Sequence, residues 1–173
     1  YCTGCGLCKN VLNCTMNRTK NGYQYPENLD KDFEKKYCFY EKKCHNNVGS
    51  DKLWGRFENV YLGFSNNTEI RKNASSGGIL TEICIYLLES KKVDGIIQIR
   101  QNSINPMKNE LIISKNKQDV LNCMGSRYSI SEPFNDIFSI LDSKNEYAIV
   151  GKPCDIQVFR NYCNINNISY IKY

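Results

Sequence analysis

The stretch of sequence that decides the fold spans residues 75–99 and reads SSGGILTEICIYLLESKKVDGIIQI. Its first part carries apolar residues at helical spacing, namely Ile79, Leu80, Ile83, Cys84, Leu87 and Leu88. That stripe predicts an amphipathic helix that ends near Ser90 and that Ser75 or Ser76 could cap. The run Ile96-Ile97-Gln98-Ile99, which follows Val93-Asp94-Gly95, reads as a strand.

The same alternation of strands and helices continues on both sides of this stretch. Further strands are expected at 60–64, 110–114, 147–150 and 168–173, and further helices at 116–123, 134–142 and 155–162. Such alternation predicts an α/β fold with a mostly parallel sheet and flanking helices. Residues 51–173 would form this domain, and residues 1–50 would form a small Cys-rich, ferredoxin-like segment before it.

Residues 1–50 are polar and hold six of the ten cysteines of the chain. Cys2, Cys5 and Cys8 follow a Cys-x2-Cys-x2-Cys pattern with glycines between them, which is typical of a [4Fe-4S] site. In an ordinary ferredoxin the fourth ligand comes four residues after the third and precedes a proline. Here Cys14 comes six residues after Cys8 and precedes Thr15. We take Cys14 as the fourth ligand, with Cys38 and Cys44 as the alternatives.

Two other uses of the thiols are open. Four thiolates also hold zinc, so the chain could be a zinc-stabilised binding module without catalysis. A secreted disulfide scaffold is the third reading, but the uneven distribution of cysteines and the ordinary core expected for residues 51–173 disfavour it.

Composition excludes several classes of protein. The chain has 173 residues, a net charge of +5 and no stripe of interleaved basic and aromatic residues, so nucleic-acid binding is not expected. No apolar run has the length of a membrane span, and a cytoplasmic location is expected. The sequence begins at Tyr1 rather than Met and ends within an expected strand, which indicates a fragment of a longer protein.

Three short motifs in the α/β part could bind a cofactor. Ser75-Ser76-Gly77-Gly78 leads into a helix whose free amides would favour a phosphate. Gly125-Ser126-Arg127-Tyr128 combines small residues with an arginine and an aromatic ring, which could hold a phosphate and stack on a ring. Gly151-Lys152-Pro153-Cys154 lies at the end of an expected strand, where α/β folds bind ligands, and places a thiol at a helix start.

These motifs, in this order, resemble the N-terminal part of the coenzyme F-420 hydrogenase/dehydrogenase beta-subunit family. Residues 75–81 resemble its Gly-Gly helix entry, residues 125–128 its Gly-Ser/Thr-Lys/Arg-Tyr turn, and residues 151–155 its Gly-x-Pro-Cys-Gln strand end. Residues 2–8 are similar to the ferredoxin segment that precedes this domain in many members. Asp155 departs from the glutamine of that motif, and Cys38 and Cys44 do not complete a second ferredoxin motif.

The resemblance implies an oxidoreductase subunit that binds FAD and a [4Fe-4S] cluster and transfers electrons to a soluble acceptor such as coenzyme F-420. It implies, as partners, a redox protein or other subunits of a hydrogenase- or dehydrogenase-like complex. By resemblance, Ser76, Gly77, Gly78, Gly125, Ser126, Arg127 and Tyr128 would shape the flavin site. Cys154 would be a cluster ligand or the catalytic redox cysteine close to the flavin, and Cys2, Cys5, Cys8 and Cys14 would hold the cluster.

Overall fold

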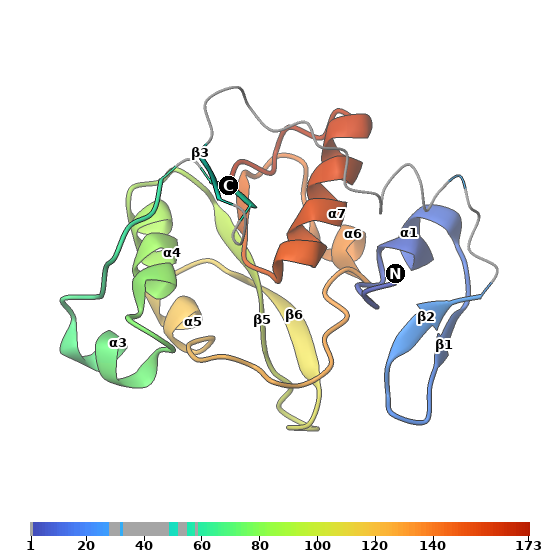
Figure 1. Ribbon diagram of the computed structural model, residues 1–173, viewed down its shortest axis with the longest axis horizontal. Helices are drawn as coiled ribbons and strands as arrows, with labels where there is room; N and C mark the ends of the chain where they lie inside the picture. The colour runs from blue at the N-terminus through green and yellow to red at the C-terminus, as the bar shows by residue number, and fades with distance from the viewer. Residues whose placement is uncertain (1, 28–31, 33–48, 52–54, 58) are drawn as a thin grey trace.

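The computed structural model describes residues 2–27, 32, 49–51, 55–57 and 59–173 and has a mixed α/β fold (Figure 1). The central sheet has the strand order β6-β5-β7, with β5 at Gly95–Gln101, β6 at Asn109–Ser114 and β7 at Tyr147–Ile149. Two small antiparallel pairs precede it: β1 (Met16–Arg18) with β2 (Gln24–Pro26), and β3 (Gly49–Asp51) with β4 (Gly55–Phe57). The α/β class expected from the sequence is confirmed.

Helices flank the sheet on both sides (Figure 1). They are α1 (Leu7–Leu12), α3 (Thr68–Asn73), α4 (Ile79–Glu89), α5 (Lys117–Leu121), α6 (Ile137–Ile140) and α7 (Pro153–Ile165). Every helix expected in the α/β part is present, with ends that differ by a few residues. In the part of the chain that the structure describes, none of the helices has the length and hydropathy of a bilayer-spanning segment.

Strand β5 separates two apolar clusters, because successive side chains of a strand point to opposite faces. Ile96 packs with residues of α3, α4 and α5, and Ile97 packs with residues of α1, α6 and α7. Both isoleucines are completely buried. The neighbouring strand β7 repeats the division, since Ala148 belongs to the first cluster and Tyr147 to the second.

The prediction of a mostly parallel sheet is wrong for the longest pair of strands, β5 and β6. β5 pairs with β7 in parallel, but it pairs with β6 antiparallel over the whole of β6. Only residues 102–108 connect β5 and β6. A parallel connection needs a crossover of a dozen or more residues, so this connection must reverse the chain directly. The Asn102 side chain stabilises the reversal by accepting hydrogen bonds from the backbone N–H groups of Ile104 and Asn105.

Two further strand predictions differ from the structure. Residues 60–64 form no strand, and the side chains of Val60, Tyr61 and Leu62 are almost fully exposed, so that prediction is wrong. At the other end of the chain, Ile171 forms a single parallel bridge with Tyr147 rather than a full strand. Backbone hydrogen bonds from Tyr147 to Tyr170, and from Lys172 back to Tyr147, hold this end beside β7.

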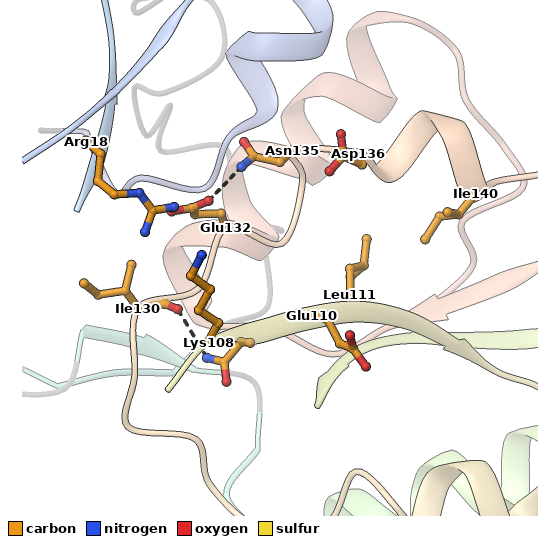
Figure 2. Close-up of a pocket in the computed structure, with 10 residues that line it drawn as sticks. Arg18, Lys108, Glu110, Leu111, Ile130, Glu132, Asn135, Asp136 and Ile140 are labelled. Carbon is orange, nitrogen blue, oxygen red and sulfur yellow. Dashed lines mark hydrogen bonds and ion pairs between the residues drawn. The ribbon is translucent and has the colours of Figure 1, made fainter. Parts of the chain in front are cut away.

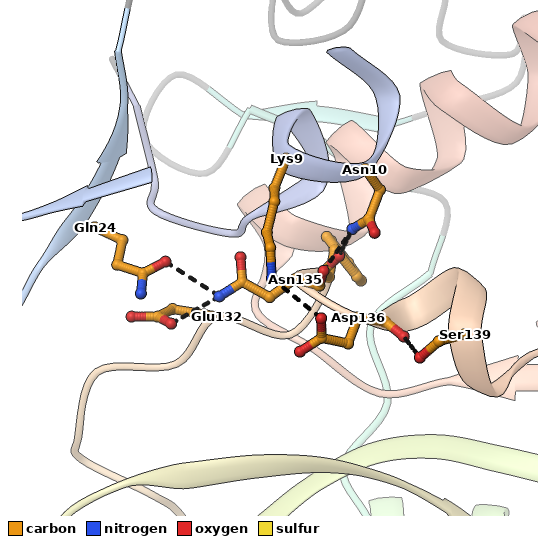
Figure 3. Close-up of polar contacts among 8 residues, drawn as sticks. Lys9, Asn10, Gln24, Glu132, Asn135, Asp136 and Ser139 are labelled. Atoms are coloured by element: carbon orange, nitrogen blue, oxygen red, sulfur yellow. Dashed lines mark hydrogen bonds and ion pairs between the residues drawn. The ribbon is translucent and has the colours of Figure 1, made fainter. Parts of the chain in front are cut away.

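The N-terminal segment packs directly onto the α/β core. Leu7 is 1% exposed and belongs to the cluster around Ile97. The loop at 132–136 contributes Phe134 to the same cluster and contacts the segment through polar groups, as Figure 3 shows. The Asn10 side chain donates to the carbonyl groups of Phe134 and Asn135, and Lys9 forms an ion pair of 3.1 Å with Asp136.

Gly6 gives a direct test of this packing. It has a φ of +82°, and a Cβ there would lie 2.0 Å from the Asn135 side-chain oxygen and 2.9 Å from the Asn135 backbone nitrogen. Gly125 also has a positive φ, of +94°, but a Cβ there meets nothing within 4 Å. Urea unfolding should therefore show Gly125→Ala losing about 1–2 kcal/mol and Gly6→Ala losing about 3 kcal/mol or more. Equal losses would show that Gly6 is not in tight contact with Asn135.

Candidate functional site

The thiol loop, residues 2–8, curls because two of its glycines take left-handed conformations. Gly4 has a φ of +71° and Gly6 a φ of +82°, which residues with a Cβ rarely adopt. The Gly4 backbone N–H donates to the Cys2 sulfur at 3.4 Å. The loop then enters α1, which buries Cys8 in its first turn.

The four predicted cluster ligands share one neighbourhood. Burial and the nearby thiols of Cys14, Cys5 and Cys2 raise the pKa of Cys8 to about 12. Burial also raises the pKa of Cys5, and Cys2 adds to that effect. Among the residues that the structure describes, no three His, Cys, Asp or Glu side chains are placed so as to hold a metal ion. The alternatives Cys38 and Cys44 lie outside the described residues.

The donor chemistry of the thiol loop fits a thiolate-bound metal centre. Each thiolate that forms beside another thiolate is destabilised by like-charge repulsion, which is why the neighbouring thiols add to the effect of burial on the pKa of Cys5 and of Cys8. A bound cation removes that penalty, because it attracts every thiolate at once. A backbone N–H aimed at a sulfur, as at Cys2, stabilises the charged form further.

A cavity of about 170 Å³ brings together two of the three cofactor motifs predicted from the sequence. Of the predicted residues, Gly78, Gly125, Ser126 and Arg127 line it. The remaining lining residues are Ser75, Leu80, Thr81, Cys84, Gln98, Ile99, Val120, Cys123, Met124 and Val150. Ser76, Gly77 and Tyr128 are not among them, and the Tyr128 side chain is 97% exposed.

The first turn of α4 opens onto this cavity without a side-chain cap. Gly78 is the N-cap residue, so the expected capping by Ser75 or Ser76 is wrong. The Ser75 hydroxyl instead accepts a hydrogen bond of 2.6 Å from the Ser126 backbone N–H, which ties the two motifs together. Gly77 is needed for packing, because a Cβ there would lie 2.7 Å from the Gly63 carbonyl oxygen.

Arg127 is held at the cavity wall by two hydrogen bonds. Its Nε donates to the Asn109 side chain at 3.0 Å, and its terminal nitrogen donates to the Pro106 carbonyl at 2.9 Å. The cavity floor contains Gln98, which donates to the Ser114 hydroxyl at 2.7 Å. The sequence did not point to Gln98, because this residue stands between Ile97 and Ile99 in an expected strand and outside the three cofactor motifs.

Cys154 is exposed in the first turn of α7. Beside it, Asp155 is 1% exposed and pairs with Lys152 at 3.4 Å. Burial raises the pKa of Asp155, and Lys152 opposes that shift. The Asp155 carboxylate is close enough to Cys5 to contribute to the raised pKa of that thiol. Val150, four residues before Cys154, lines the cavity. The junction of β7 and α7 therefore lies between the thiol loop and the cavity.

A second cavity, of about 280 Å³, lies where the N-terminal segment meets β6 (Figure 2). Its charged side chains are largely paired with one another or with neighbours: Arg18 with Glu132, Glu110 with Arg100, and Asp136 with Lys9. Burial raises the pKa of Glu132, and Arg18 opposes this shift. This cavity is larger than the first one, and the buried side-chain oxygen of Asn135 in its lining has no hydrogen-bond partner among the described residues. Most of its charged side chains are already paired, and none of the cofactor motifs predicted from the sequence lines it, so it is the weaker candidate for a cofactor.

Comparison with known proteins finds a family model that matches the central part of the chain. Residues 60–137 match the family model described as coenzyme F420 hydrogenase/dehydrogenase, beta subunit N-term. The chain is 29% identical over 112 residues to a coenzyme F420 hydrogenase subunit beta of Methanococcus voltae, which covers 62% of this chain and 39% of that protein. It is 24% identical over 100 residues to an F420-dependent formate dehydrogenase subunit beta of Methanocaldococcus jannaschii, which covers 58% of this chain and 26% of that protein.

A solved structure supports the same relationship. The F420-reducing [NiFe] hydrogenase complex from Methanosarcina barkeri, in a xenon derivative, contains a chain that matches with a TM-score of 0.55 and 27% identity. The match covers 61% of this chain and 37% of the other one. This chain thus spans less than two fifths of the length of the relatives that it matches. The family resemblance read from the sequence motifs is confirmed.

Two buried thiols outside the thiol loop predict how stability depends on pH. Burial raises the pKa of Cys84 and of Cys163 to about 11, whereas a thiol in an unfolded chain ionises near about pH 8.5. Between these values the unfolded chain loses protons that the folded chain keeps, so the free energy of unfolding should fall as the pH rises. Urea unfolding in reductant from pH 7.5 to 10.5 should show this fall, and Cys163→Ala should make it shallower. An unchanged slope in that variant would contradict the prediction.

Proposed function

Because residues 60–137 belong to the coenzyme F420 hydrogenase/dehydrogenase beta-subunit family, we propose that this chain is part of an iron–sulfur flavoprotein oxidoreductase subunit. It would relay electrons between a [4Fe-4S] cluster, FAD and a soluble acceptor such as coenzyme F420. The single observation that carries this proposal is the position of the β7–α7 junction. The Asp155 carboxylate in this junction contributes to the raised pKa of Cys5 in the thiol loop. Val150 in the same junction lines the cavity that joins two cofactor motifs.

The thiol loop would hold the cluster through Cys2, Cys5 and Cys8, and Cys14, which follows α1, would be the fourth ligand. When bound, the cluster supplies one-electron transfer and the flavin supplies the exchange between single electrons and a hydride. The chain itself would position the cluster. The packing of Leu7 in the core and the hydrogen bonds from Asn10 to residues 134 and 135 hold the thiol loop beside α7.

The cavity would hold part of the FAD. Pockets that enclose a whole cofactor usually measure about 300–1,000 Å³, so a cavity of about 170 Å³ accommodates one portion of the molecule. The uncapped first turn of α4 and the guanidinium of Arg127 favour the diphosphate. Cys154, exposed at the start of α7, would meet the reacting atoms between the two cofactors.

The partners would be other subunits of a hydrogenase- or dehydrogenase-like complex, in the cytoplasm. The relatives support this, since one solved relative is a chain of a hydrogenase complex and another relative is a subunit of a formate dehydrogenase. The alternative function is a zinc-stabilised binding module. Protein purified without oxygen that contains zinc, no iron and no flavin would favour that alternative.

The thiol loop is tested by Cys5→Ser. We expect anaerobically purified protein to contain iron and to absorb near 400 nm, about the region typical of iron–sulfur clusters. Cys5→Ser should lose its iron and the cluster's share of that absorbance and keep the absorbance of its flavin, because the two sites lie on different elements. Cys163→Ala is the matched control, since Cys163 is buried in the core on α7, and it should keep its iron. Loss of iron and flavin together in Cys5→Ser would contradict the two-site arrangement.

The cavity is tested by Arg127→Ala. Removing a charge-assisted contact with a phosphate should weaken FAD binding by about tenfold or more. The matched control is Arg71→Ala, because Arg71 lies on α3 with its guanidinium 3.8 Å above the centre of the Phe64 ring, away from the cavity lining. Titration of the flavin-free protein with FAD, followed by flavin fluorescence, measures both affinities. Equal affinities in the two variants would place the diphosphate elsewhere.

A further inference from the structure

Helix α4 is apolar on two opposite faces, and this chain covers only one of them. Cys84, Ile85 and Leu87 are buried against the sheet and α5. A second stripe follows at positions i, i+4 and i+7 on the opposite side, with Ile79 40% exposed, Ile83 48% and Tyr86 56%. A helix that is apolar all round is normally buried all round.

The segment before α3 shows the same lack of a partner. Its sequence, Val60-Tyr61-Leu62-Gly63-Phe64, reads as a buried strand, yet Val60 is 80% exposed, Tyr61 86% and Leu62 fully exposed. Within the described stretches of the chain, no backbone hydrogen bond involves residues 60–63. The segment therefore has the composition of a strand, with exposed side chains and with no backbone pairing among the described residues.

These two features form one surface. A Cβ on Gly63 would lie 3.2 Å from the end of the Ile79 side chain, so the segment meets the exposed stripe of α4 at its first residue. Figure 1 shows both at the edge of the molecule, on the opposite side of the sheet from α7. We call this surface the apolar face and define it by Val60, Tyr61, Leu62, Ile79, Ile83 and Tyr86. Large contiguous apolar surfaces of this kind mark interaction sites in soluble proteins.

We propose that the apolar face is the docking site for the region that follows Tyr173 in the complete polypeptide, which adds a strand along residues 60–63 and covers α4. Two observations select this occupant. The family model that matches residues 60–137 describes the N-terminal part of the family, and the relatives are more than twice as long as the stretch they share with this chain. Leu80, which is 57% exposed, also lines the cofactor cavity, so a region that covers α4 would complete the cavity wall.

The test compares the 173-residue chain with the polypeptide that its complete reading frame encodes. Hydrogen exchange reports the backbone amides of residues 61–63, and hydroxyl-radical labelling reports the side chains of Leu62, Ile83 and Tyr86. In the longer polypeptide we expect amide exchange to slow by about a hundredfold and side-chain labelling to fall by about tenfold. Ile104 and Met107, which are 92% and 80% exposed at the β5–β6 turn, are the matched controls and should not change.

Three results would overturn the proposal. The first is equal exchange and labelling of the apolar face in the two polypeptides, or a reading frame that ends at Tyr173. The second is protection in the 173-residue chain that grows with protein concentration, which would assign the face to a second copy. The third is protection of the longer polypeptide only when a separate subunit is added. Each result leaves the proposed redox function intact, because that function rests on the thiol loop and the cavity.

Discussion

The two-sided burial of β5 is the constraint on which the rest of the structure depends. Ile96 and Ile97 are adjacent in the sequence and completely buried, so both faces of this strand must be covered. Helix α4 covers one face, and α7, α6 and α1 cover the other. A strand buried on both sides needs apolar residues at adjacent positions rather than strict alternation, and Ile96 and Ile97 provide them. A sheet of three strands can organise this core because helices from both halves of the chain pack on it.

The same constraint brings the candidate sites together. α1 belongs to the layer that covers Ile97, so burying Leu7 also fixes the thiol loop that precedes it. α7 belongs to the same layer, and its first turn follows the end of β7, where α/β folds place ligands. On the other face, α4 covers Ile96, and the first turn of this helix lines the cavity. The redox function proposed here thus depends on how two layers share one strand.

Polar contacts then set the precise fit between the N-terminal segment and the core. Asn135 donates to Gln24 and to Glu132, and its side-chain oxygen rests against Gly6. Arg18 pairs with Glu132 at 3.1 Å, although 114 residues separate them in the sequence. These contacts lie near the surface, where single ion pairs contribute little to stability. Their contribution is to orientation, because several of them act together on one short loop.

The sequence by itself determined the α/β class, the helices around 79–89 and 153–165, and the strands around 95–101 and 147–149. These features depend on local periodicity and on the residue types that a turn or a helix start requires. Only the tertiary structure decided that β6 runs antiparallel and that residues 60–64 are not paired. It also decided that Gln98, Cys84 and Cys123 line the cavity, and that residues 132–136 hold the thiol loop. The physical reason is that strand pairing and cavity lining depend on contacts between residues far apart in the chain, and the spacing of residues along the sequence does not specify which of those contacts form.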